Sequence, residues 1–144
     1  MERYLPTGNE TISLPKLNAD TAGIEDITFL YMQQKGMIEL RGSDDLPLIL
    51  PFIEVGGQAF RLESLQWQRQ HAWLPSMEAK AGDLDFSMVI LPPVGERGFA
   101  MKLSVTASKQ TSFTWGVHGC WDSSWHCVNE DKQLEGSAYC YESL

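Results

Sequence analysis

Two segments in the second half of the chain alternate between apolar and polar residues with a period of two. Successive side chains of a β-strand point to opposite faces, so this pattern is typical of a strand with one buried face. Both segments are therefore expected to be antiparallel strands that cover a core. The apolar positions are Leu84, Phe86, Met88 and Ile90 in the first segment, and Phe99, Met101, Leu103 and Val105 in the second.

Short β-type segments separated by turn residues occupy the remainder of the chain. Residues 28–40 form an expected hairpin that turns at Lys35-Gly36. Residues 48–55 are apolar on both faces and contain Pro51, which lacks a donor and predicts an edge strand or a bulge. Residues 64–74 alternate again, with Leu65, Trp67, Arg69, His71 and Trp73 on one face. No segment convincingly predicts a helix.

Strands that recur every 8 to 12 residues predict an all-β fold, an antiparallel β-sandwich with little or no helix. A parallel α/β architecture needs crossover helices, for which the chain has no room. A length of 144 residues suits one domain. We expect residues 1–144 to form a single sandwich, with residues 1–25 as an extended N-terminal arm that holds one short strand near Thr11–Leu14.

Charge and cysteine content exclude several classes of protein. The net charge of −8 opposes electrostatic binding of nucleic acid. No apolar run approaches the roughly 18 to 20 residues that cross a bilayer, and the N-terminus lacks the apolar core of a signal peptide. The three cysteines are too few for a disulfide framework. Reduced thiols in the cytoplasm are the expected state.

Four potential soft-metal ligands lie within ten residues, at His118, Cys120, His126 and Cys127. Zinc sites use four N or S ligands, but this spacing matches none of the common patterns, and adjacent strand residues point to opposite faces. A thiol nucleophile activated by His118 or His126 would need an orienting group, and no local signature supplies one. We therefore expect ordinary buried cysteines, no metal and no cofactor, with the cluster kept as a weak candidate.

The chain contains five tryptophans. Sugars stack on aromatic rings, so exposed tryptophans on a sandwich would suit carbohydrate binding; the alternative is cross-strand aromatic packing. Trp115 shares the inward parity of Phe113 and Val117 and is expected in the core. The candidate carbohydrate-binding residues are Trp67 and Trp73 on one expected strand, and Trp121, Asp122 and Trp125 around an expected turn.

Three stretches carry a resemblance to a known family: Tyr4-Leu5-Pro6, Trp67 to Trp73-Leu74-Pro75, and Ile90 to Phe99 with the strand that follows to Thr106. Over residues 25–120 the chain resembles the N-terminal β-sandwich ("supersandwich") of bacterial glycoside hydrolases built on a six-hairpin (α/α) barrel. The resemblance implies a non-catalytic domain, because the catalytic carboxylates of those enzymes sit in the helical barrel. No catalytic residue is carried over to this chain.

The leading expectation is a non-catalytic sandwich domain of a carbohydrate-active protein that packs on a catalytic domain. This reading predicts an exposed apolar face larger than a few hundred Å2. The alternatives are a stand-alone module that binds carbohydrate or another small ligand through its tryptophans, and a small enzyme that uses His118, Cys120 or His126. An exposed apolar face would also allow a homodimer.

Overall fold

The computed structural model describes residues 4–30, 36–62, 65–71, 73–127, 131–134 and 139–143. These residues contain fourteen β-strands and no helix, which confirms the predicted all-β, sandwich-like fold. The strands are β1 (Thr7–Gly8), β2 (Ile12–Leu14), β3 (Asp26–Phe29), β4 (Met37–Arg41), β5 (Leu50–Val55), β6 (Gln58–Arg61), β7 (Gln66–Gln70), β8 (Leu74–Ala81), β9 (Leu84–Leu91), β10 (Ala100–Ala107), β11 (Phe113–Trp121), β12 (Ser123–Cys127), β13 (Asp131–Leu134) and β14 (Tyr139–Ser143).

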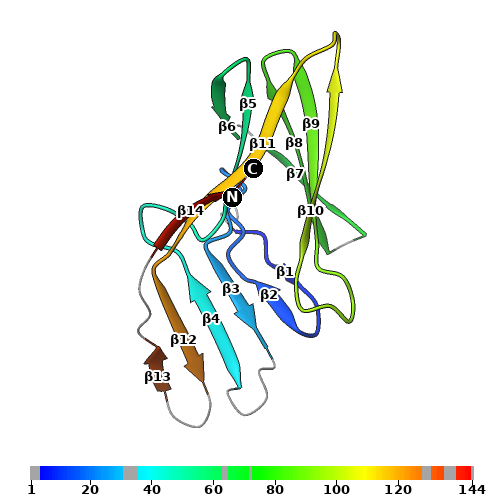
Figure 1. Cartoon of the computed structure of the whole chain (residues 1–144). Helices are drawn as coiled ribbons and strands as arrows, with labels where there is room; N and C mark the ends of the chain where they lie inside the picture. Colours follow the sequence, from blue (N-terminus) through cyan, green and yellow to red (C-terminus); the bar gives the residue numbers. More distant parts are fainter. Residues whose placement is uncertain are drawn as a thin grey trace.

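The strands form three antiparallel sheets (Figure 1). Sheet 1 has the order β1-β2-β3-β4-β12-β13, sheet 2 the order β10-β9-β8-β7, and sheet 3 the order β14-β11-β5-β6. Sheets 2 and 3 face each other in the upper half of Figure 1, and sheet 1 extends below them. One hydrophobic core joins all three sheets, since its buried members include Ile12 of β2, Ile53 of β5 and Met88 of β9.

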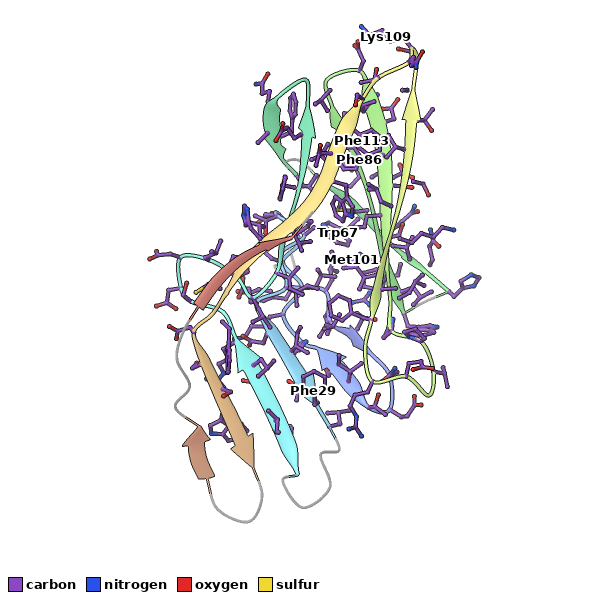
Figure 2. The ribbon with its side chains drawn as sticks, in the orientation of Figure 1. Phe29, Trp67, Phe86, Met101, Lys109 and Phe113 are labelled. Carbon is purple, nitrogen blue, oxygen red and sulfur yellow. The ribbon has the colours of Figure 1, made fainter. Side chains whose placement is uncertain are left out.

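Strand β9 confirms the predicted alternation, with Leu84, Phe86, Met88 and Ile90 all buried. The neighbouring strand β10 repeats it in register, because Met101 pairs with Ile90 and Leu103 with Met88. Consecutive hairpins build sheet 2, so its inner face is apolar and its outer face carries the polar half of each alternation. Figure 2 shows Phe86, Trp67 and Met101 on the inner side, toward sheet 3.

The two strands of the hairpin expected over residues 28–40 are present as the antiparallel pair β3–β4, while Lys35 of the expected turn lies outside the described residues. The expectation that the strand containing Pro51 lies at a sheet edge or carries a bulge there is wrong, because β5 pairs with both β11 and β6 and its register with β11 runs unbroken through Pro51. The ladder to β6 begins only at Phe52, however, while Pro51 pairs with Val117 of β11. A central strand tolerates the missing donor of proline at a point where its neighbour on one side has already ended.

The long strand expected over residues 64–74 is wrong in its second half. Strand β7 ends at Gln70, which pairs with Leu74 of β8 across a three-residue loop. His71 has a φ of 51°, and the Trp73 amide donates to the Gln70 carbonyl at 3.3 Å. His71 is the second residue of the turn closed by this hydrogen bond, a position where a positive φ normally calls for glycine, asparagine or aspartate, and the sequence gives no such signal.

The N-terminal residues, expected as an extended arm, contain β1 and β2 and contribute heavily to the core. Ile12, Leu14, Leu17, Ala22 and Ile24 are all buried. The N-terminal segment is therefore part of the hydrophobic core.

The expected turn between Trp121 and Trp125 does not reverse the chain. Strand β11 belongs to sheet 3 and β12 to sheet 1, and the two follow each other with only Asp122 between them (Figure 1). The Asp122 amide donates to the carbonyl of Arg41 at 3.0 Å. The chain thus changes sheets at Asp122, an outcome that local sequence does not distinguish from a tight turn.

Candidate functional site

A groove of about 850 Å3 lies on the outer face of sheet 2. All four strands of the sheet contribute to it. Its lining consists of Gln66, Glu78, Ala79, Lys80, Asp85, Phe86, Ser87, Ser104 and Thr106. Seven of these nine residues are polar or charged, so the groove offers hydrogen-bonding groups rather than an apolar pocket.

Strand register brings the polar residues together in two cross-strand rows. Gln66 pairs with Glu78, Glu78 with Ser87, and Ser87 with Ser104. A second row runs through Lys80, Asp85 and Thr106. Residues directly opposite on one face have Cβ atoms about 4.5 to 5.5 Å apart. Each row therefore forms a continuous line of donors and acceptors across the sheet.

The charges within the groove largely balance. The Lys80 ammonium contacts the Asp85 carboxylate at 2.8 Å, and this hydrogen bond raises the pKa of Lys80. Both side chains are exposed, so the pair is screened by solvent and contributes little to stability. Glu78 is the remaining ionisable group of the lining. The groove thus combines one unneutralised carboxylate with an amide and three hydroxyls.

Sequence reasoning did not single out these groove residues. The sequence does contain these residues in a regular pattern. They are the polar residues that alternate with the apolar residues that predicted the core, and the pattern recurs in successive strands. Polar residues on a strand ordinarily indicate a solvated face, and only the register between four strands shows that they form a groove.

The structure separates Trp67 from Trp73. Trp67 lies on β7 with its ring half-buried against the core, and its indole N–H donates to the carbonyl of Ala19. Trp73 lies in the β7–β8 loop and is 44% exposed. Because the strand ends at Gln70, the two rings do not follow one another on one strand face.

Trp121, Asp122 and Trp125 occupy the junction between sheets 3 and 1. Trp121 is half-buried and packs on the core, and Asp122 is exposed. Trp125 lies on β12, where it pairs with Glu39 of β4. Trp121 belongs to sheet 3 and Trp125 to sheet 1, so no reversing turn separates them.

His118 and Cys120 lie on β11 of sheet 3. The His118 ring stacks on Phe52 with centroids 5.6 Å apart and an interplanar angle of 22°, and Cys120 is buried. The side chains of His126 and Cys127 lie outside the described residues. Within the described part of the chain, no three His, Cys, Asp or Glu side chains come together as a group that could hold a metal ion.

The large hydrophobic side chains that are exposed in the described residues are Trp73, Val94 and Phe113. They lie in the β7–β8 loop, in the β9–β10 loop and at the start of β11, respectively. These three residues do not belong to one element, so the described chain offers less support for a broad apolar docking face than for a polar groove.

Comparisons with protein-family models, with curated proteins and with solved structures found no match to this chain. The resemblance to the sandwich domain of six-hairpin glycoside hydrolases therefore stays a prediction. No helix in the described residues has the length and apolar character needed to cross a membrane.

Proposed function

We propose that this chain is a non-catalytic β-sandwich module that binds a neutral polyhydroxylated ligand, a sugar chain, in the groove on sheet 2. The observation that carries the proposal is the polar lining formed by the two cross-strand rows. Sugar hydroxyls both donate and accept hydrogen bonds. The amide of Gln66, the carboxylate of Glu78 and the hydroxyls of Ser87, Ser104 and Thr106 complement them.

Charge favours a neutral ligand over an anionic one. Among the described lining residues the one ammonium, that of Lys80, is already paired with Asp85, and the Glu78 carboxylate repels phosphate or sulfate groups. The whole chain carries a net charge of −8, which adds to that repulsion.

The proposal differs from the tryptophan-based expectation in the surface that it uses. A sugar in the groove would be held by hydrogen bonds, whereas Trp73 in its loop would offer a single stacking ring. The module would serve a glycoside hydrolase-like parent protein by holding a sugar chain beside a helical-barrel catalytic domain, as the family resemblance implies.

Calorimetric titration with a panel of neutral oligosaccharides tests the proposal. Ser104→Trp fills the groove with an indole and is expected to abolish binding. Glu78→Gln removes the carboxylate with little change of shape and should weaken binding about threefold to tenfold, as expected for one charge-assisted hydrogen bond. Glu54→Gln, the same change on β5 of sheet 3, is the matched control and should leave the affinity unchanged.

Circular dichroism of each variant confirms that the fold is retained. Binding that survives Ser104→Trp in a folded protein would contradict the groove assignment. Binding that survives Ser104→Trp and is lost with Trp73→Ala would instead assign the sugar to the exposed tryptophan.

A further inference from the structure

Strand β10 forms one edge of sheet 2. It spans eight residues, Ala100–Ala107, and among the described residues its only ladder partner is β9 (Figure 1). The main-chain donors and acceptors on its other side have no strand partner in the described part of the chain. Such an edge is a ready template for an additional strand.

The inner face of β10 is covered less well than that of β9. Leu103 pairs with Met88, yet Met88 is fully buried while Leu103 is half-buried. Met101 and Val105 are half-buried in the same way. The apolar side chains on the inner face of β10 are therefore only partly covered at this edge of the sandwich.

Sheet 3, which faces sheet 2, also has incompletely covered apolar side chains on the side of β10. Phe113 at the start of β11 is 39% exposed, and Trp115 is half-buried where it packs on the core. Figure 2 shows Phe113 and Met101 in the space between the ribbons of β11 and β10. In the described ladder β14 pairs with β11 only from Val117 onward, so residues 113–116 have a strand neighbour on one side alone.

This side of the molecule also differs from the remainder in charge. Residues 97–121 contain Arg97, Lys102 and Lys109 and no Asp or Glu, although the chain has 19 acidic residues in total. Lys109 pairs with Asp83 at 2.7 Å, whereas Lys102 takes part in none of the ion pairs between described residues. Lys102 lies midway along the edge strand, on its outer face.

We propose that β10 accepts an extended segment of a partner protein in which apolar and acidic residues alternate. The segment adds to sheet 2 as a fifth strand through main-chain hydrogen bonds. Its apolar side chains extend the inner rows over Met101, Leu103 and Val105 toward Phe113. Its carboxylates lie on the outer face beside Lys102.

The same lysine disfavours a second copy of this chain as the occupant. An antiparallel self-pairing centred on Leu103 keeps the apolar rows aligned but places the two Lys102 side chains diagonally across the new ladder. Like charges in neighbouring cross-strand positions are destabilising, and lysine on an edge strand commonly prevents such self-pairing.

The test uses the full chain and three synthetic eight-residue peptides, capped at both ends. One alternates Glu and Val, the second alternates Lys and Val, and the third has the Glu and Val residues in two blocks. The alternating Glu/Val peptide should bind, with slowed amide hydrogen exchange confined to residues 99–107. The block peptide should bind at least about tenfold more weakly, because its apolar residues cannot all face one side of the sheet.

Reversing the charge of Lys102 then tests whether this lysine contacts the acidic side chains of the peptide. Lys102→Glu should weaken the Glu/Val peptide about tenfold and improve the Lys/Val peptide. Arg69→Glu on β7, the opposite edge of the same sheet, is the matched control and should change neither affinity. Hydrogen exchange of the unliganded variants shows that both remain folded.

Three results would overturn the proposal: no binding of the alternating Glu/Val peptide at millimolar concentration, equal affinities for wild type and Lys102→Glu, or protection that maps to β7. A concentration-dependent dimer that protects residues 99–107 without any peptide would assign the edge to a second copy and would also overturn it. The two proposals can fail separately, because the peptide assay contains no sugar and its two variants, Lys102→Glu and Arg69→Glu, lie outside the groove lining.

Discussion

Asn9 donates through its side-chain amide to the carbonyl of Glu96 at 2.9 Å, across 87 residues of sequence. The same amide also donates to the Pro93 carbonyl, while Asn9 Oδ1 accepts from the backbone amides of Thr11 and Ile12 at 2.8 and 2.9 Å. Asn9 therefore shapes the β1–β2 turn and ties sheet 1 to the β9–β10 loop of sheet 2. A single asparagine side chain thus connects two sheets that have no ladder in common.

Two substitutions of Asn9 should separate its role in the β1–β2 turn from its role between the sheets. Asn9→Ala removes all of these hydrogen bonds and should lower the free energy of unfolding by about 2 kcal/mol. Asn9→Asp keeps the acceptor of the turn and loses the donor between the sheets, so its cost should be smaller, about 1 kcal/mol. Urea denaturation measures both values, and an Asn9→Ala protein as stable as the wild type would contradict this role.

The two tryptophans around the β7–β8 hairpin should behave differently. Trp67→Phe keeps an aromatic ring but leaves the Ala19 carbonyl without its indole donor, and should cost about 1 to 2 kcal/mol of stability. Trp73→Phe, at an exposed loop position, should change stability by less than about 0.5 kcal/mol. Thermal unfolding distinguishes them, and equal effects would mean that Trp67 does not anchor the N-terminal segment.

Gly119 is expected to tolerate no side chain. A Cβ at this position would lie 2.1 Å from the carbonyl oxygen of Leu48, because β11 passes directly over the chain there. The Cys120 amide donates to the Pro47 carbonyl at 3.1 Å and holds this close approach. Gly119→Ala should therefore cost about 3 kcal/mol or more through backbone displacement.

Gly98→Ala is the matched control for that substitution. A Cβ at Gly98 meets no atom within 4 Å, so stability should stay within about 0.5 kcal/mol of the wild type. Chemical denaturation of both variants checks the pair. A stable Gly119→Ala protein would show that β11 does not approach Leu48 as closely as described.

The ion pair between Lys16 and the buried carboxylate of Asp26 predicts a loss of stability at high pH. The two groups are 2.7 Å apart, and the hydrogen bond from Lys16 to Asp26 raises the pKa of Lys16 above 10.5. A raised pKa in the folded state contributes stability below the unfolded value and loses it as the pH rises through the folded value. Because Lys16 is half-exposed, solvent screening limits this contribution to about 1 kcal/mol.

Lys16→Met isolates that contribution. The wild type should be about 1 kcal/mol more stable than the variant at pH 8, and the difference should fall toward zero as the pH rises through the raised pKa of Lys16. Urea denaturation at several pH values between 8 and 12 measures it. A difference that stays constant over this range would mean that the ion pair does not stabilise the fold.

Local alternation in the sequence predicted the strands whose environment is simplest. Strand β9 and the hairpin β3–β4 follow directly from it, because each buries one face of a regular antiparallel pair. The alternation did not predict the structure where contacts between distant parts of the chain determine it. Pro51 lies in a central strand at a residue that the ladder to β6 does not reach, and the Asp122 amide meets the Arg41 carbonyl where the chain changes sheets.

The candidate site was less accessible to sequence reasoning than the fold. Tryptophans can be recognised one at a time in a sequence, and they were therefore the predicted sugar-binding residues. In the structure Trp67 instead packs on the core and donates a hydrogen bond to Ala19 of the N-terminal segment. The groove residues Gln66, Glu78, Ser87 and Ser104 are unremarkable individually. They become a site only through the register of four strands, which depends on the lengths and conformations of three successive turns.

We propose that the outer face of sheet 2 binds a neutral sugar chain. The most direct test is a titration of the 15N-labelled protein with neutral oligosaccharides, followed by amide chemical shifts. We predict saturable shifts at Gln66, Glu78, Ser87 and Ser104, with little change at Trp73 and Asp122. Shifts confined to Trp73 or to the Trp121–Trp125 junction would contradict sugar binding in the groove. The absence of shifts at millimolar sugar would contradict it as well.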